Sequence, residues 1–139
     1  MTGLQKLLNR AYEVMTKSDK QAKFLLDACL LIQFATRLGF KVTGGELYRP
    51  QEMQLIYYNT GRSKTLTSQH KQKLAIDLNF IIGGRYINAL SSSETEDILR
   101  PLGKFWESLD PQNRWGGNFD KDFSRKDPWI DAGHFERQE

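Results

Sequence analysis

The sequence is poor in cysteine, in histidine and in long hydrophobic runs. Its single cysteine, Cys29, excludes an internal disulfide bond. No stretch approaches the ~20 consecutive apolar residues of a membrane-spanning helix, so we expect no insertion into a membrane. The N-terminal residues also lack the continuous apolar segment and the small-residue cleavage site of a secretory signal peptide. These absences predict a chain that is made in the cytoplasm without a signal peptide.

The sequence also lacks a large excess of charge of either sign. The 139 residues include 20 lysines and arginines against 17 aspartates and glutamates, which gives a net charge of +3. The chain has neither a strong basic patch nor a recognisable nucleic-acid-binding motif, which argues against a nucleic-acid partner. Its length and its 39% hydrophobic content suit one packed domain over residues 1–139, and we expect this domain to be a monomer.

Hydrophobic periodicity predicts N-terminal helices within residues 1–39. Apolar residues recur at helical spacing over residues 4–16. Ser18 followed by Gln21 has the form of a capping box, which starts a second helix that ends at Gly39. The pattern predicts that the apolar face of this helix carries Ala22, Leu25, Leu26, Cys29, Ile32 and Leu38.

Short strands and one more helix are expected in the middle of the chain. Residues 40–43 alternate like a strand, and Pro50 suits the first turn of a helix that reaches about residue 58. Residues 74–82 have the apolar composition of a buried strand. The following Gly83-Gly84 pair predicts a hairpin.

The C-terminal third predicts a helix, an irregular loop and a last strand. Ser93 with Glu96 forms a second capping-box signal, and Pro101 predicts a kink or a split in the helix that follows. From Asp110 onward the composition is that of a loop, which leads to a strand around residues 133–136. The whole pattern predicts an α+β fold, with helices packed on a small, mostly antiparallel sheet.

The two histidines each stand near carboxylates. His70 precedes Asp77, which interrupts an apolar strand, and His134 lies between Asp131 and Glu136. Imidazole is the commonest metal ligand in proteins, and carboxylates complete many catalytic zinc sites. Each segment alone also fits a structural role, because Asp77 can pair with a basic residue and His134 can be a hydrogen-bonded core residue. Spacing by itself leaves both interpretations open.

Taken jointly, these segments resemble a known family. The patterns Ser68-x-His70-x4-Ala75-x-Asp77 and Asp131-x-Gly133-His134-Phe135-Glu136 are similar to those of zinc D-Ala-D-Ala carboxypeptidases and L-alanyl-D-glutamate endopeptidases. Members of this family cleave peptidoglycan stem peptides, and many are phage endolysins. Arg49 and the Trp115-Gly116-Gly117 element share the resemblance, which covers about residues 40–136 and implies the same α+β fold.

The resemblance implies a Zn2+ ion held by His70, Asp77 and His134. Asp131 takes the place of the general base, and Arg49 takes the place of an arginine that contacts the scissile carbonyl group. Substrate-binding or ligand-supporting roles are implied for Ser68, Glu136 and Trp115.

The identity of the general base stays open at this point. On a regular strand Glu136 shares the face of His134 and Asp131 does not, so spacing alone favours Glu136. The resemblance favours Asp131, because Ala132-Gly133 can supply a bend that turns its side chain inward. The sequence also departs from the family pattern, since Lys73 stands where glycine is usual and Asn118 stands where aspartate is frequent.

The resemblance implies a zinc metallopeptidase that hydrolyses peptidoglycan peptides. The bond expected is L-Ala-D-Glu, in an endolysin that acts on the cell wall after release during host cell lysis. One alternative is a D-Ala-D-Ala carboxypeptidase or dipeptidase. Another is a non-catalytic, zinc-containing wall-binding module, against which an open metal coordination position and the acid beside His134 argue.

Overall fold

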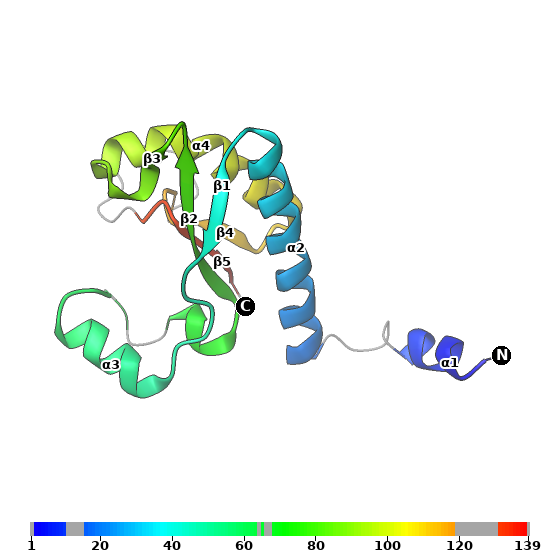
Figure 1. The fold of residues 1–139 in the computed structure, drawn as a ribbon. Helices are drawn as coiled ribbons and strands as arrows, with labels where there is room; N and C mark the ends of the chain where they lie inside the picture. Colours follow the sequence, from blue (N-terminus) through cyan, green and yellow to red (C-terminus); the bar gives the residue numbers. More distant parts are fainter. Residues whose placement is uncertain (1, 11–15, 64, 66–67, 119–130, 139) are drawn as a thin grey trace.

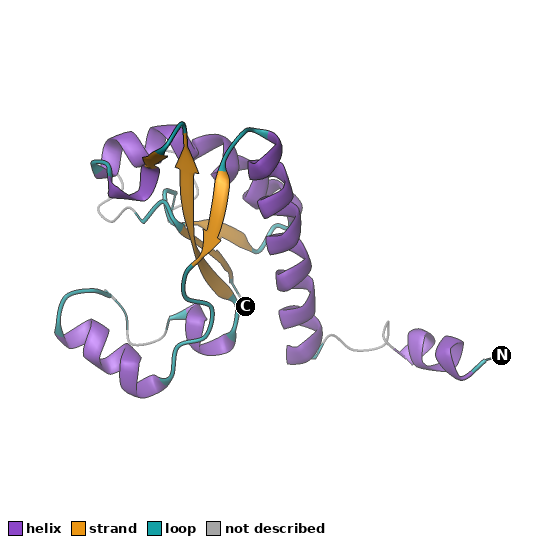
Figure 2. Ribbon diagram, in the orientation of Figure 1, coloured by secondary structure: helices purple, strands orange, loops and turns teal. Residues whose placement is uncertain are grey.

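Helices pack on a small antiparallel sheet, which confirms the α+β fold class (Figures 1 and 2). The computed structural model describes residues 2–10, 16–63, 65, 68–118 and 131–138. The strands are β1 (Lys41–Gly44), β2 (Ala75–Ile82), β3 (Arg85–Tyr86), β4 (Asn113–Trp115) and β5 (His134–Arg137). They form a sheet of order β1-β2-β5-β4, with β3 paired to β2 in the predicted hairpin.

The helices are distributed along the whole described chain. They are α1 (Gly3–Arg10), α2 (Lys17–Arg37), α3 (Gln51–Asn59), α4 (Ser92–Leu109) and the short 3-10 helices η1 (Gln69–Gln72) and η2 (Ile87–Ala89). Figure 1 shows α2 beside the sheet, α3 and η1 together at one end of it, and α1 apart from the rest. No described helix is long and apolar enough to cross a membrane.

The central strands have one apolar face and one polar face. Side chains alternate between the faces of a strand, so Leu78 and Phe80 of β2 point to one side and Asp77 to the other. In the same way Phe135 of β5 lies on the apolar side, while His134 and Glu136 lie on the polar side. This period of two separates the hydrophobic core from the candidate site within single strands.

Helices α2 and α4 cover the apolar face. Trp106 of α4 is fully buried and meets both Phe24 of α2 and Phe135 of β5 edge to face. Its indole Nε1 also donates a 3.0 Å hydrogen bond to the backbone carbonyl oxygen of Glu136. The core therefore holds β5 in place from behind. Its buried apolar residues are Phe24, Ala28, Leu31, Ala35, Phe40, Leu74, Leu78, Phe80, Ile87, Leu99, Leu102, Trp106, Trp115, Ala132 and Phe135.

Most of the predicted buried face of α2 was wrong, although Ile32 packs against the core. Leu25 and Leu26 are 51% and 63% exposed and Cys29 is exposed, whereas Phe24 and Leu31 face the core. Apolar residues surround most of this helix, so periodicity alone does not select the inward side. The core side even includes a carboxylate, Asp27, which is neutralised by Lys23 and accepts a hydrogen bond from Asn113 Nδ2.

Both predicted helix starts lay two residues too late. The capping box of α2 is formed by Thr16 and Asp19, whose side chain and backbone groups bond to each other in both directions. Helix α4 begins at Ser92, and Ser91 before it caps the helix by accepting a hydrogen bond from the backbone N–H of Glu94. The same residue types recur at neighbouring positions, so the chemistry of the cap was predicted but not its register. Of the expected first helix, the structure describes Gly3–Arg10, and residues 11–15 lie outside the described part.

Two further predictions in the C-terminal third were wrong. Helix α4 continues through Pro101 without a break. Proline has no N–H, so a carbonyl group of the preceding turn loses its helical hydrogen bond. Because Pro101 lies on the exposed side of the helix, water can donate to that carbonyl group instead. Residues 113–115 form strand β4 instead of loop. Three residues with glycines after them carry too weak a periodic signal for a strand prediction.

A substitution at Gly103 of α4 tests the packing between α4 and β4. A Cβ atom there would lie 2.1 Å from ring carbons of Trp115, which is fully buried. Overpacking of this kind costs roughly 1–3 kcal/mol, more than the gain in helix propensity. We expect Gly103→Ala to lower the free energy of unfolding in urea by about 2 kcal/mol.

Gly3→Ala in α1 is the control, because no heavy atom of the described residues lies within 4 Å of its added Cβ. It should leave the free energy of unfolding unchanged. A Gly103→Ala variant as stable as the natural chain would contradict this account of the packing.

Candidate metal centre

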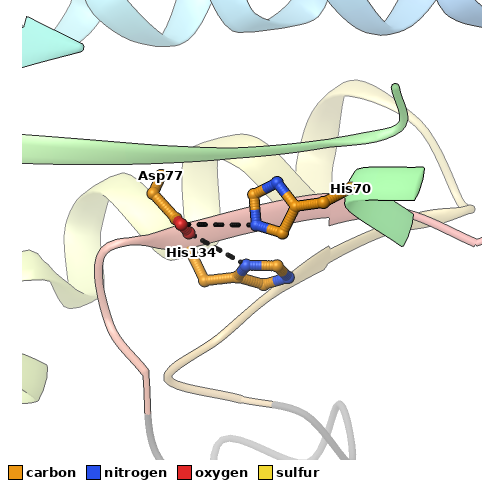
Figure 3. A group of neighbouring side chains, drawn as sticks. All are labelled: His70, Asp77 and His134. Carbon is orange, nitrogen blue, oxygen red and sulfur yellow. Dashed lines mark hydrogen bonds and ion pairs between the residues drawn. The ribbon is translucent and has the colours of Figure 1, made fainter. Parts of the chain in front are cut away.

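The pairing of β2 with β5 brings Asp77 and His134 face to face. The two residues are Cα partners in the antiparallel register, so their side chains leave the same face of the sheet. His134 Nδ1 lies 3.1 Å from Asp77 Oδ1 (Figure 3). The β2–β5 register therefore brings together two residues that are 57 positions apart in the sequence.

His70 reaches the same point from η1. Ser68 caps this short helix, since its Oγ accepts a 3.2 Å hydrogen bond from the His70 backbone N–H. The ring Nδ1 lies 3.0 Å from the carbonyl oxygen of Leu47, which can only accept, so Nδ1 is assigned the hydrogen. The lone pair of Nε2 then faces Asp77, whose Oδ2 is 3.3 Å away.

These three residues can hold a metal ion. One ligand atom from each of His70, Asp77 and His134 lies within 4.8 Å of the others. His70 Nε2 is buried and makes no hydrogen bond of acceptable geometry to the described residues, which is costly for a polar atom unless another partner is bound. Two imidazoles with one carboxylate are a donor set that suits zinc with a coordination position left open. The three residues therefore fit a zinc ion.

Glu136 fixes the orientation of the second imidazole. Its Oε1 lies 2.8 Å from His134 Nε2, and its Oε2 accepts hydrogen bonds from Arg114. A hydrogen on Nε2 that is donated to Glu136 leaves His134 Nδ1 free to face Asp77 and a metal ion. Both carboxylate oxygens of Glu136 are therefore engaged within the sheet.

The charges around His134 perturb the neighbouring pKa values. Burial alone would lower the pKa of His134, but hydrogen bonds to Asp77 and Glu136 together with their charges raise it to about 10. Burial would raise the pKa of Asp77, but the hydrogen bond from His134 and the nearby imidazoles of His134 and His70 hold it well below its usual range. In the metal-free protein a proton on His134 thus compensates the carboxylates.

Asp131 lies at the edge of this cluster. Its carbonyl oxygen accepts a 3.0 Å hydrogen bond from the His134 N–H, which closes a turn before β5. The residue is exposed, yet the surrounding chain removes enough water from its carboxyl group to raise its pKa, while the nearby His134 lowers it and Asp77 raises it. A carboxylate of raised pKa that faces solvent beside a metal position is suited to accept a proton.

Trp115 and Gly116 support the turn at Asp131. Trp115 Nε1 donates a 2.8 Å hydrogen bond to the carbonyl oxygen of Ala132. A Cβ atom on Gly116 would lie 1.9 Å from the carbonyl oxygen of Asp131, so glycine is needed for this close approach. Trp115 itself is fully buried, and its side chain packs in the core rather than along an accessible groove.

Arg49 approaches the cluster from the segment before α3. Its backbone N–H donates to the carbonyl oxygen of His70, and its guanidinium group is bound by Glu46 and by Gln54, with Tyr57 stacked against it. The charge of Arg49 also lowers the pKa of Asp131, which indicates that the two side chains share one electrostatic environment. Neither Glu46 nor Gln54 was identified from the sequence, because nothing in a polar loop marks which residues will hold an arginine.

Lys73, which stands where the family pattern usually has glycine, has a left-handed backbone. It adopts φ 58°, a conformation that glycine takes most easily, and it closes η1 three residues after His70. Its Nζ lies 5.5 Å from the ring centre of Tyr48. A lysine in this conformation carries a backbone cost that a glycine would avoid.

A small cavity adjoins Asp131 on the side of η2 and α4. Its volume is about 150 Å3, and it is lined by Asn88, Leu90, Ser92, Thr95, Asp131, Ala132 and Gly133. Asp131 thus borders open space on this side of the turn that precedes β5.

Comparisons with known proteins point to one family. A family model described as D-alanyl-D-alanine carboxypeptidase matches residues 61–137, which contain His70, Asp77, Asp131 and His134. Among solved structures, the chain is similar to the Serratia marcescens L-Ala D-Glu endopeptidase ChiX, with a TM-score of 0.57 and 19% identity over 94% of this chain and 95% of that chain. The latter similarity is one of fold. No curated protein sequence matches the chain.

The protonation of His134 makes metal binding depend on pH. Because the raised pKa keeps a proton on this ring up to about pH 10, a metal ion that binds through Nδ1 must displace at least one proton. Lower pH therefore favours the proton and higher pH favours the metal. We expect the affinity for Zn2+ to rise roughly tenfold per pH unit between about pH 6 and 8.

Titration calorimetry in two buffers of different ionisation enthalpy measures both the affinity and the number of protons released. A zinc affinity that is constant with pH, without proton release, would show that His134 Nδ1 is not a ligand.

Proposed function

Because the chain belongs to the D-alanyl-D-alanine carboxypeptidase family of peptidases, we propose that it is a zinc-dependent peptidase that hydrolyses peptidoglycan peptides. The observation that carries the proposal is the convergence of His70, Asp77 and His134, with their ligand atoms within 4.8 Å and one buried imidazole nitrogen left without a hydrogen bond. A structural zinc site usually has four protein ligands, whereas a catalytic one keeps a position open for substrate.

The proposed general base is Asp131. When bound, zinc would supply Lewis-acid chemistry, polarising a carbonyl group and lowering the pKa of a water molecule. Asp131 accepts the proton of the attacking water and returns it to the leaving amine. Its raised pKa brings its proton affinity closer to neutral pH, and its exposure leaves the carboxylate accessible to water.

Glu136 is the weaker candidate for this role. Its side chain is bound to His134 on one oxygen and to Arg114 on the other, and the residue is only 5% exposed. A base in that position would have to release one of these partners before it could reach a water molecule. The contacts therefore support Asp131, as the family resemblance does.

Arg49 is proposed to stabilise the developing oxyanion. Glu46 and Gln54 hold the Nε and NH1 groups, and the Tyr57 ring lies 4.6 Å from the guanidinium carbon. The remaining NH2 group makes no hydrogen bond to the described residues and is proposed to donate to the scissile carbonyl oxygen. Such anchoring lowers the cost of ordering the side chain at the moment of reaction. Ser68 serves the site indirectly, by capping the turn that carries His70.

The bond proposed is L-Ala-D-Glu, with an endolysin-like role in which the enzyme acts on the cell wall after release. The fold shared with an L-Ala D-Glu endopeptidase supports this choice. The alternative, cleavage of D-Ala-D-Ala, is favoured by the description of the matching family. Both reactions need the same metal and base, so the products must decide between them.

Metal removal tests the enzyme class and the bond together. We expect a chelator to abolish the digestion of purified peptidoglycan and added Zn2+ to restore it. Sequencing of the new termini should show free D-Glu amines. Release of D-Ala instead would favour the carboxypeptidase, and wall binding without any released peptide would favour a non-catalytic module.

A substitution tests the base separately from the metal. Asp131→Asn removes the proton acceptor but leaves the three ligands, so we expect kcat to fall by about 10^2-fold or more while zinc binding is retained. Asp97→Asn, at an exposed position on α4, is the matched control and should keep full activity. Full turnover by Asp131→Asn would exclude Asp131 as the base.

A further inference from the structure

The row of side chains on the polar face of the sheet extends beyond the ligands. Asp77 of β2 lies opposite His134 of β5, Glu136 follows two residues later on the same face, and Arg114 of β4 lies opposite Glu136. Three adjacent strands thus align Asp77, His134, Glu136 and Arg114 through their register alone.

Hydrogen bonds connect this row from one end to the other. Asp77 Oδ1 lies 3.1 Å from His134 Nδ1, and His134 Nε2 lies 2.8 Å from Glu136 Oε1. Arg114 approaches Glu136 Oε2 through Nε at 3.2 Å and NH2 at 2.9 Å, so a fork of two donors meets one carboxylate oxygen. The two N–H groups of the rigid guanidinium hold this oxygen from fixed directions, which the single, freely rotating ammonium group of a lysine cannot do.

Two carboxylates compete for the ring hydrogen of a neutral His134. If the hydrogen sits on Nδ1 and is donated to Asp77, the lone pair faces away from the metal position. If it sits on Nε2 and is donated to Glu136, the lone pair of Nδ1 faces Asp77 and His70. Glu136 is only 5% exposed, and a buried carboxylate of this kind needs a cationic partner to stay ionised and in place. Arg114 is that partner.

We propose that Arg114 is a positioning residue for the metal site, which acts through Glu136 to hold His134 in the tautomer that presents Nδ1. Arg114 and Glu136 together form the Arg114–Glu136 clamp. The inference rests on the proposed zinc function and names a residue of β4, a strand that the sequence pattern does not indicate. The clamp does not touch the ligand atoms, so its effect is on how well the site is preorganised.

The test measures zinc affinity by competition with a chromophoric chelator. We expect Arg114→Gln to weaken Zn2+ binding by about 10- to 100-fold, the range found when a supporting partner of a metal ligand is removed. Arg114→Lys keeps the charge but not the pair of donors, so its zinc affinity should lie between that of the natural chain and that of Arg114→Gln. It also keeps the test decisive if Arg114→Gln does not fold.

Arg137→Gln is the matched control. Arg137 is on the same strand as Glu136 and pairs with Asp110 at 3.1 Å, but its side chain leaves the opposite face of the sheet. The loss of this ion pair should lower stability without weakening zinc binding. If Arg114→Gln and Arg137→Gln lower zinc affinity equally, the effect is one of general stability and the clamp is wrong.

Nitrogen-15 NMR of the zinc-loaded protein gives a second readout that does not depend on activity. In the natural chain the His134 ring should show a metal-bound Nδ1 and a slowly exchanging Nε2–H, and Arg114→Gln should accelerate that exchange. Unchanged zinc affinity and unchanged Nε2–H exchange in a folded Arg114→Gln variant would overturn the proposed role of the Arg114–Glu136 clamp and leave the proposed zinc function standing. Absence of zinc binding in the natural chain would overturn the proposed metal function as well.

Discussion

The antiparallel pairing of β2 with β5 is the constraint on which the rest of the site depends. It fixes Asp77 opposite His134, and a shift of β5 by one residue would turn His134 toward the hydrophobic core and away from Asp77. That shift is opposed by the apolar face of the same strands, where Leu78 and Phe135 are buried under α2 and α4. The hydrophobic core thus specifies the register, and the register specifies the ligand geometry.

The same constraint explains why so many polar groups can be buried near one point. Taking an ion out of water costs several kcal/mol even after relaxation, so an isolated Asp77 or Glu136 in the sheet would be strongly unfavourable. Here His134 lies between the two carboxylates, and Arg114 neutralises the outer one. His70 Nε2 remains without a hydrogen bond among the described residues, as expected of a site that is completed by a cation. In the metal-free protein a proton on His134 supplies part of that positive charge.

The sequence predicted the parts of the fold that depend on local chemistry. The α+β class, the strand around Asp77, the Gly83-Gly84 hairpin and the last strand were all confirmed, because each has a periodic pattern or a turn signal. The inward face of α2 was missed, since its apolar residues occupy several sides and only contacts with α4 and β1 select one. Strand β4 was missed because three residues give no periodicity. The contact from Arg114 to Glu136, which depends on that strand, could therefore not be predicted either. In the candidate site, the convergence of His70, Asp77 and His134 could be expected from the family resemblance, whereas the hydrogen bond to Leu47 that orients His70 depends on tertiary structure.

The central claim is that the two imidazoles and the carboxylate hold zinc through defined atoms, and anomalous X-ray diffraction at the zinc absorption edge from crystals of the zinc-loaded protein tests it most directly. The account predicts one strong peak about 2.0–2.2 Å from His70 Nε2, from His134 Nδ1 and from a carboxylate oxygen of Asp77. The absence of a peak at this point, or a zinc ion bound instead to His134 Nε2 and Glu136, would contradict it.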